Sequence, residues 1–198
     1  MRQIFSILAL SIFLFTGCKK SEITDEASLP RPGGSTINLT QGLVAYYPFT
    51  GNANDESGFG NHGIVNGATL TKDRFNKLNK AYSFNGVSNL IYTGIFINNI
   101  QDSFTLSYWM NYDASNQSLM PYRYPFFKGT TGQNDDFNSR LNPQNRSDFA
   151  VYDGTNGSFL PSKNQIQSNQ WINITNVFNG HEVKLFINGV LDTSKVSS

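Results

Sequence analysis

The chain contains many short runs of apolar and aromatic residues, each separated from the next by turn-forming residues. Its 198 residues include 16 Phe, 9 Tyr and 17 Gly. Aromatic and β-branched residues favour strands, whereas Gly and Asn favour tight turns. The runs that we expect to form strands are Ala81 to Phe84, Asn89 to Thr93, Phe104 to Tyr112, Tyr124 to Lys128, Phe149 to Asp153, Trp171 to Phe178 and Glu182 to Ile187. Since no segment of helical length carries an apolar stripe, the sequence predicts an all-β chain folded as an antiparallel β-sandwich.

The clearest local prediction is a hairpin towards the end of the chain. Asn188-Gly189 lies between two apolar arms, and Asn-Gly in that setting is the strongest short-range hairpin signal. Nearer the start, residues 43–49 form an apolar and aromatic run that contains Pro48. Because proline lacks the N–H that a ladder needs, we expect an edge strand or a strand that bends there.

The N-terminus has the pattern of an export signal. Arg2 precedes an apolar run, Ile4 to Phe15, that is too short to span a bilayer as a stable helix, and Thr16-Gly17 supplies small residues. Cys18, the one cysteine of the chain, follows directly. We therefore expect residues 1–17 to be a signal peptide that is removed. The alternative is an ordinary secretory peptide followed by an incidental cysteine.

The remainder divides into a tether and one domain. Residues 18–41 are charged, small, Pro or Gly types without apolar periodicity, which is typical of a flexible tether. Residues 42–198 are enough for one domain with a core and too few for two. Loss of residues 1–17 removes Arg2 from the 15 basic residues and none of the 14 acidic ones, leaving a formal net charge of zero. That balance excludes an electrostatic surface for nucleic acid.

Several motifs occur in the order of a known family. Residues 42–49 (GLVAYYPF), 55–63 (DESGFGNHG) and 82–86 (YSFNG) resemble the opening of a laminin-G-like, concanavalin A-like lectin/glucanase domain. Residues 103–109 (SFTLSYW) and the stretch 171–189 resemble its later part. The resemblance implies a jelly roll of two antiparallel sheets. Such domains usually continue past the Asn-Gly hairpin, so we expect either a sandwich without its last strands or a sheet edge left open for a partner strand.

The segment Phe15-Thr16-Gly17-Cys18 resembles the lipobox of bacterial lipoproteins, with phenylalanine where leucine is more usual. The resemblance implies that the Cys18 thiol becomes a thioether to diacylglycerol and that its freed amine is usually acylated too. Each buried methylene contributes roughly 0.8 kcal/mol, so two or three acyl chains hold a protein on a membrane. We therefore expect a lipid-anchored protein of the bacterial cell envelope, at the outer membrane or the cell surface.

Several members of the resembled family bind calcium through Gly-rich loops, where carbonyl and side-chain oxygens converge on the ion. The positions that we predict as ligands of a structural calcium are Asp55, Asn61, Asn85 and Asn89. Ser88-Asn89 stands where relatives often carry aspartates, which removes charge from such a site. The alternative is that these side chains cap turns through Asx hydrogen bonds.

A sugar-binding surface needs flat aromatic side chains beside hydrogen-bonding groups. In the expected strand Phe104 to Tyr112, alternation places Trp109 on a face with small polar residues. We predict that Trp109 stacks on a ligand together with Tyr122 and Tyr124 from the following loop. The alternative is that this loop covers Trp109, because tryptophans are highly buried on average. Trp171 matches a position that packs inside in relatives, so the resemblance places it in the core.

The sequence carries little that points to catalysis. Glycosidases need two carboxyl groups flanking the scissile bond, and the Glu-x-Asp-x-Glu run typical of the family's hydrolases is absent. No zinc-ligand set or nucleophile elbow occurs either. We therefore expect a non-enzymatic domain that binds carbohydrate or another surface ligand. The alternatives are a glycan hydrolase or lyase that uses Asp135, Asp136 or Asp148, and an adhesion module whose partner is a protein.

Overall fold

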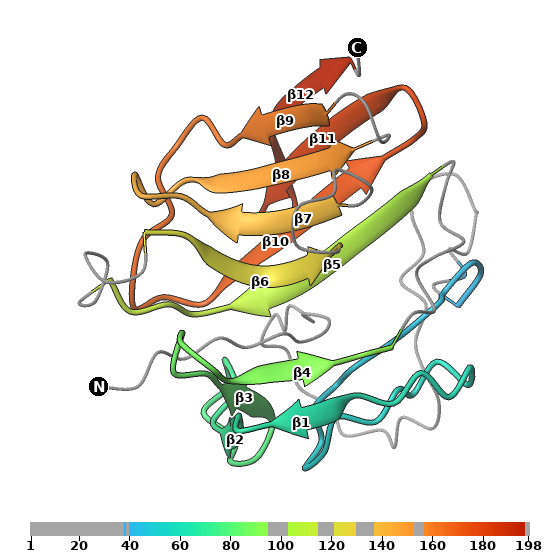
Figure 1. Cartoon of the computed structure of the whole chain (residues 1–198), viewed down its shortest axis with the longest axis vertical. Helices are drawn as coiled ribbons and strands as arrows, with labels where there is room; N and C mark the ends of the chain where they lie inside the picture. Colours follow the sequence, from blue (N-terminus) through green and yellow to red (C-terminus); the bar gives the residue numbers. More distant parts are fainter. Residues whose placement is uncertain are drawn as a thin grey trace, which may run out of the picture.

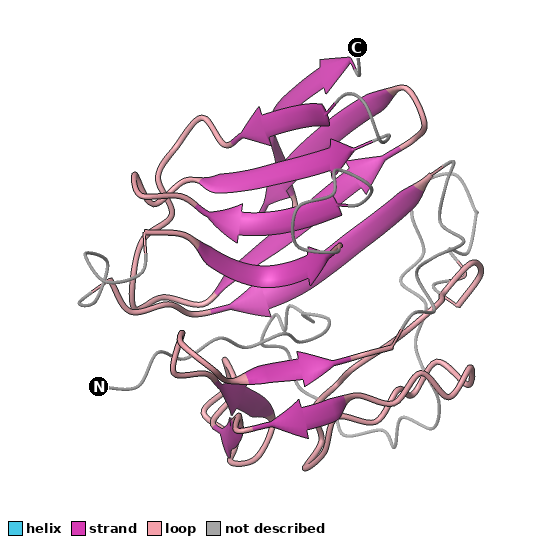
Figure 2. Cartoon of the chain, in the orientation of Figure 1, coloured by secondary structure: helices cyan, strands magenta, loops and turns pink. Residues whose placement is uncertain are grey.

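The computed structural model describes residues 38, 40–94, 103–114, 121–129, 137–152 and 157–196. Cys18, Asp135 and Asp136 lie outside these ranges. The described chain forms strands and no helix (Figure 2), and therefore none of the kind that crossing a bilayer requires. The strands are β1 (Ile64–Asn66), β2 (Thr69–Thr71), β3 (Ala81–Ser83), β4 (Leu90–Tyr92), β5 (Phe104–Met110), β6 (Arg123–Lys128), β7 (Phe137–Leu141), β8 (Ser147–Tyr152), β9 (Gly157–Pro161), β10 (Ile172–Phe178), β11 (Glu182–Ile187) and β12 (Val190–Val196).

Two four-stranded antiparallel sheets form the main body. Their strand orders are β12-β11-β10-β5 and β6-β7-β8-β9. Strand β9 lies close to β11 and β12 at one side of the body. The ladders β1-β4 and β2-β3 lie at the other side, next to β5 and β6 (Figure 1). The predicted all-β sandwich is confirmed.

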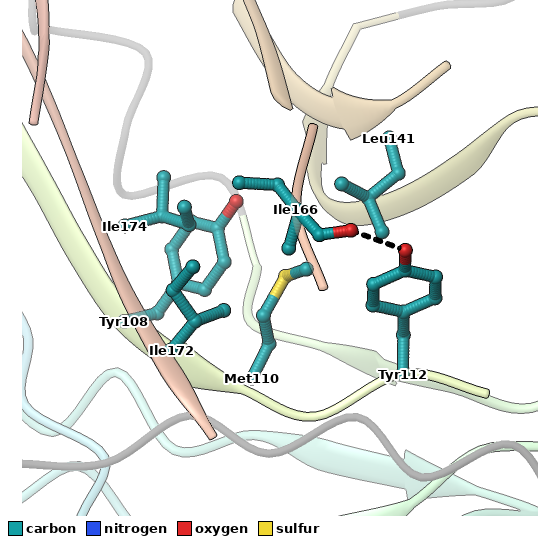
Figure 3. Packing of buried hydrophobic residues seen from close by; sticks show 7 residues of the cluster. All are labelled: Tyr108, Met110, Tyr112, Leu141, Ile166, Ile172 and Ile174. Atoms are coloured by element: carbon teal, nitrogen blue, oxygen red, sulfur yellow. Dashed lines mark hydrogen bonds between the residues drawn. The ribbon is translucent and has the colours of Figure 1, made fainter. Parts of the chain in front are cut away.

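The space between the two sheets is filled by side chains that alternate along each strand. On β5, Tyr108 and Met110 are buried, whereas Thr105 and Ser107 are exposed. The buried pair packs with Ile172 and Ile174 of β10, and with Leu141, Tyr112 and Ile166 from other parts of the chain (Figure 3). A second cluster joins Phe137, Phe149 and Leu160 of one sheet to Val183 and Leu185 of the other. Each such buried side chain contributes about 1.5–3 kcal/mol.

Polar side chains also meet in this interior. The hydroxyl groups of Tyr108 on β5 and Ser139 on β7 form a 2.6 Å hydrogen bond, and Asn176 Nδ2 on β10 donates to Ser139 Oγ at 2.8 Å. All three residues are buried. Asn176 Oδ1 has no partner among the described groups. The two sheets are therefore joined at this point by directional bonds as well as by apolar packing.

The segment before β1 differs from its expectation. Residues 43–49, where we expected an edge strand or a bending strand, contain no strand. Phe49 has a φ of 53°, which is uncommon for a bulky residue, and its buried ring meets the Tyr82 ring edge-on with a centroid distance of 5.0 Å. Phe84 packs against this small cluster and against the Tyr108 cluster, so the two are continuous.

The hairpin near the end of the chain is confirmed. Asn188 and Gly189 have φ values of 50° and 79°, the positive values that a two-residue hairpin turn of this type requires. The turn joins β11 to β12 in antiparallel register. Prolines within strands occur on β6 and β9, the edge strands of their sheet, where an absent N–H is tolerated.

Replacing Ser139 with alanine should destabilise the protein by roughly 1–3 kcal/mol, because the Tyr108 hydroxyl and the Asn176 amide would lose their shared buried partner. The free energy of unfolding from denaturant titration measures this. Ser107→Ala is the matched control, because that hydroxyl lies on the exposed face of β5, and its effect should stay within about 0.5 kcal/mol. Equal losses in the two variants would contradict the role of the buried group.

Candidate functional site

The loop before β1 is organised by the Asp55 carboxylate. It accepts hydrogen bonds from the N–H groups of Tyr46 and Ser57 at 2.9 Å and of Asn61 at 3.0 Å, and from the Ser57 hydroxyl at 2.8 Å. The Asp55 N–H donates to His62 Nδ1. Burial alone would raise the pKa of Asp55, but these hydrogen bonds outweigh it and lower the pKa. The carboxylate is thus occupied in holding the loop closed.

The loop between β3 and β4 is closed in the same way. Asn85 Oδ1 accepts the N–H groups of Val87, Ser88 and Asn89, and the Asn85 N–H donates to Asn89 Oδ1. Each side-chain oxygen here already receives backbone N–H groups. Asn85 and Asn89 therefore cap this turn through Asx hydrogen bonds, as the alternative to calcium binding expected.

The four predicted calcium ligands do not meet. Asn61 precedes β1 and Asn89 precedes β4, and these strands are antiparallel, with Ile64 opposite Tyr92. The two loops therefore lie at opposite ends of the ladder. No group of three or more His, Cys, Asp or Glu gathers within the described ranges. These four residues do not fit one calcium site, and calcium binding stays a prediction of the sequence.

Trp109 lies on the outward side of β5, as the alternation predicts, but another side chain covers it. The Arg74 guanidinium lies 4.3 Å from the Trp109 ring and 4.4 Å from the Phe75 ring. Arg74 belongs to a turn that the Asp73 carboxylate fixes by accepting the N–H groups of Phe75 and Lys77. Trp109 is thus covered by a cation–π contact from the turn before β3.

Tyr122 and Tyr124 lie on a different surface from Trp109. Phe137 and Leu141 of β7 point into the core, so alternation directs Arg140 outward from the sheet β6-β7-β8-β9. The Tyr122 ring lies 4.6 Å from the Arg140 guanidinium on this outer side. Trp109 faces outward from the opposite sheet. The structure therefore keeps Tyr122 and Tyr124 together and separates both from Trp109.

The outer face of this sheet carries an aromatic group around one cation, which we name the Arg140 cluster: Tyr122, Tyr124, Arg140, Asp148 and Phe159. The Phe159 ring also lies near the guanidinium, at 5.3 Å. Arg140 and Asp148 are direct cross-strand partners, and Arg140 Nε lies 3.2 Å from Asp148 Oδ2. The aromatic residues remain exposed, at 43% for Tyr122, 47% for Tyr124 and 39% for Phe159.

The charges in this cluster balance. Burial would lower the pKa of the Arg140 guanidinium, but its interactions with Tyr124 and Asp148 raise it. Asp148 is 1% exposed, and Asn142 Nδ2 donates to its Oδ1 at 2.9 Å. Burial raises the pKa of this carboxyl, although Arg140 and Asn142 act in the opposite direction. Asp148 therefore positions Arg140 and has no exposed oxygen to offer a substrate.

Neither Arg140 nor Phe159 was predicted from the sequence as a residue of a binding site. Residues 137–141 read FNSRL and residues 157–161 read GSFLP, and neither run looks like a strand by composition. Once both are taken as strands, period-two alternation places Arg140 and Phe159 on one outer face. That alternation was the signal available in the sequence.

Trp171 also differs from its expectation. It is half-buried and not a core residue, because Ile172 and Ile174 point inward from β10 and the adjacent Trp171 points outward. It lines a hollow together with residues of the β11–β12 turn, among them Asn188.

Asp55→Asn should destabilise the protein at pH 7 by about 2 kcal/mol, because charged acceptors form the stronger hydrogen bonds. Because the pKa of Asp55 is lowered in the folded state, the folded protein binds fewer protons than the unfolded chain. The stability that the charged carboxylate contributes is therefore complete above the unfolded pKa of about 3.9. It is lost as the pH falls through the lower pKa of the folded state. Unfolding free energies of the wild type and of Asp55→Asn, measured from pH 7 downwards, should converge as the pH falls through the native pKa of Asp55. Glu56→Gln, an exposed neighbour, is the control, and a gap that persists at low pH would contradict the prediction.

Known proteins resemble this chain in sequence and in fold. Residues 85–198, more than half of the chain, match the laminin-G model of the concanavalin A-like lectin/glucanases superfamily. Comparison with curated proteins gives no match. The fold is similar to domain 4 of AbnA, a GH43 extracellular arabinanase from Geobacillus stearothermophilus, solved with arabinotriose. The TM-score is 0.50 at 14% identity, over 78% of this chain and 75% of that one. The chain belongs to the concanavalin A-like lectin/glucanase superfamily.

Proposed function

We propose that this domain binds a neutral oligosaccharide at the Arg140 cluster and does not cleave it. The observation that carries the proposal is the exposure of three aromatic rings around hydrogen-bonding groups on one sheet face. A sugar ring has an apolar face and a rim of hydroxyl groups. Tyr122, Tyr124 and Phe159 supply apolar surface, while the guanidinium and the tyrosine hydroxyls supply donors and acceptors.

The charge state of the cluster supports a neutral ligand. Asp148 neutralises Arg140 at 3.2 Å, so the Arg140 guanidinium itself offers an acidic sugar no unpaired charge. Bringing a carboxylate against the buried Asp148 would also add like-charge repulsion. A neutral glycan forms hydrogen bonds with Arg140 and leaves its ion pair intact.

The structural neighbour supports the ligand class. Domain 4 of the arabinanase was solved in complex with arabinotriose, a neutral trisaccharide. The likeness of the two chains extends to the fold at 14% identity, so arabinotriose is a first probe for this protein and not an assigned ligand.

A binding role without hydrolysis agrees with the state of Asp148. Of the three aspartates considered for catalysis, Asp148 lies within the described residues. Arg140 contacts one of its carboxylate oxygens, and Asn142 donates a hydrogen bond to the other. A general acid must reach the leaving group, and a buried carboxylate held in this way does not. We propose further that the domain is held at the bacterial cell envelope by lipid on Cys18.

Tyr124→Ala and Tyr122→Ala should each weaken oligosaccharide binding at least about tenfold, the equivalent of roughly 1.4 kcal/mol, by removing stacking surface. Isothermal titration calorimetry with arabinotriose, xylotriose and cellotriose measures the loss. Phe59→Ala is the control, because Phe59 is 70% exposed in the loop before β1, away from the cluster. A wild-type protein that binds none of these sugars, or tyrosine variants that bind normally, would refute the proposed site.

Cys18→Ser should abolish lipid attachment, because the hydroxyl does not form the thioether. In bacteria that produce the full chain, the wild type should enter the detergent phase on Triton X-114 partition, and the variant should stay in the aqueous phase. The mass of the mature N-terminal peptide provides an independent readout. An unmodified thiol at Cys18 in the wild type would overturn the anchor.

A further inference from the structure

The hollow that Trp171 lines lies at the end of the sheet β12-β11-β10-β5. The segment from Lys163 to Ile172 forms one wall, and the β11–β12 turn forms the other. Its volume is about 390 Å³, within the range of small-ligand sites. Every residue that lines it is described.

The lining combines one indole with side-chain amides. Trp171 supplies the aromatic surface, and Gln165, Gln167 and Gln170 project amides that each offer donors and an acceptor. These three glutamines are exposed, and no hydrogen bond to another described residue occupies their side chains. Paired donors and acceptors beside an aromatic ring suit vicinal hydroxyl groups on a sugar.

The hollow carries no net charge. Lys163 and Asp192 are its charged residues, and the Asp192 carboxylate already accepts the Lys163 backbone N–H at 2.6 Å. One cation and one anion leave the lining with no net charge that would select an acidic or a basic ligand. The chemistry favours a neutral polyhydroxylated ligand.

Both walls are fixed by hydrogen bonds. The Ile166 N–H donates to the Asn145 carbonyl at 2.6 Å, and the Tyr112 hydroxyl donates to the Ile166 carbonyl at 2.6 Å (Figure 3). On the other side, the Asn188 N–H donates to the Asn173 carbonyl, and the Asn173 N–H donates to Asn188 Oδ1, both at 2.9 Å. A binder whose site is already ordered loses less entropy when its ligand arrives.

We infer that this hollow, which we name the Trp171 hollow, is a second binding site for a neutral oligosaccharide. The inference rests on the proposed function, because it assigns the same ligand class to another surface. The Arg140 cluster lies on the outer face of the sheet β6-β7-β8-β9, whereas Trp171 directly precedes β10 of the opposite sheet. Two sites on one rigid domain raise the affinity for a polymer that reaches both, without any new contact.

The test is the stoichiometry of oligosaccharide binding by the folded protein. Calorimetry with arabinotriose, xylotriose and cellotriose should give two sites for the wild type with at least one of these sugars. Trp171→Ala should leave one site, Tyr124→Ala should leave the other, and the double variant should leave none. Gln167→Ala, an exposed substitution, should weaken only the site that Trp171→Ala removes, and this separates ligand binding from damage to the fold.

The outcomes distinguish the two proposals. One site that Tyr124→Ala abolishes, and that Trp171→Ala and Gln167→Ala leave unchanged, would overturn the Trp171 hollow and keep the proposed function. One site that responds to Trp171→Ala and Gln167→Ala, and not to Tyr124→Ala, would keep the hollow and refute the Arg140 cluster. No binding of any of the three sugars would overturn both.

Discussion

The relative position of the two sheets depends on a buried hydrogen-bonded group that spans them. Apolar burial supplies most of the free energy, but it is non-directional and would allow several sheet offsets. Ser139 of β7 can meet both Tyr108 of β5 and Asn176 of β10 in only one arrangement, and any slip would leave buried polar groups without partners. The inward register set by this group also determines which residues face outward. The Arg140 cluster follows from it, because Arg140 is the next residue after Ser139.

Strands with clean alternation were predictable from the sequence. β5, β10 and β11 were anticipated within a residue or two, and the hairpin at Asn188-Gly189 was anticipated as well. β7 and β9 were missed because Ser139 and Ser158 are polar residues at buried positions. A local pattern cannot show that a serine will find a partner in another layer. From sequence alone, a segment with such polar residues is therefore assigned to a loop, although in the folded protein they are buried strand residues.

The candidate site shows the same limit at the level of topology. Trp109 was grouped with Tyr122 and Tyr124 because they are close in sequence, yet β5 and β6 belong to different sheets. A chain that passes from one sheet to the other turns the outward faces of successive strands in opposite directions. Tyr122 instead contacts Arg140 of β7, whose guanidinium also contacts Phe159 of β9. The sequence could therefore indicate that aromatic residues form the site. Which residues lie beside them could be known only from the order of the strands in each sheet.

The same topology gives the domain two separate surfaces with similar chemistry. Each combines exposed aromatic surface with polar groups whose charges cancel, through Asp148 and Arg140 on one side and through Asp192 and Lys163 on the other. Neither surface depends on a catalytic geometry or on a metal that the described residues would have to hold. A short ligand would contact one surface at a time. A polymer long enough to reach both would be retained by their combined effect, as the proposed binding of a glycan without cleavage requires.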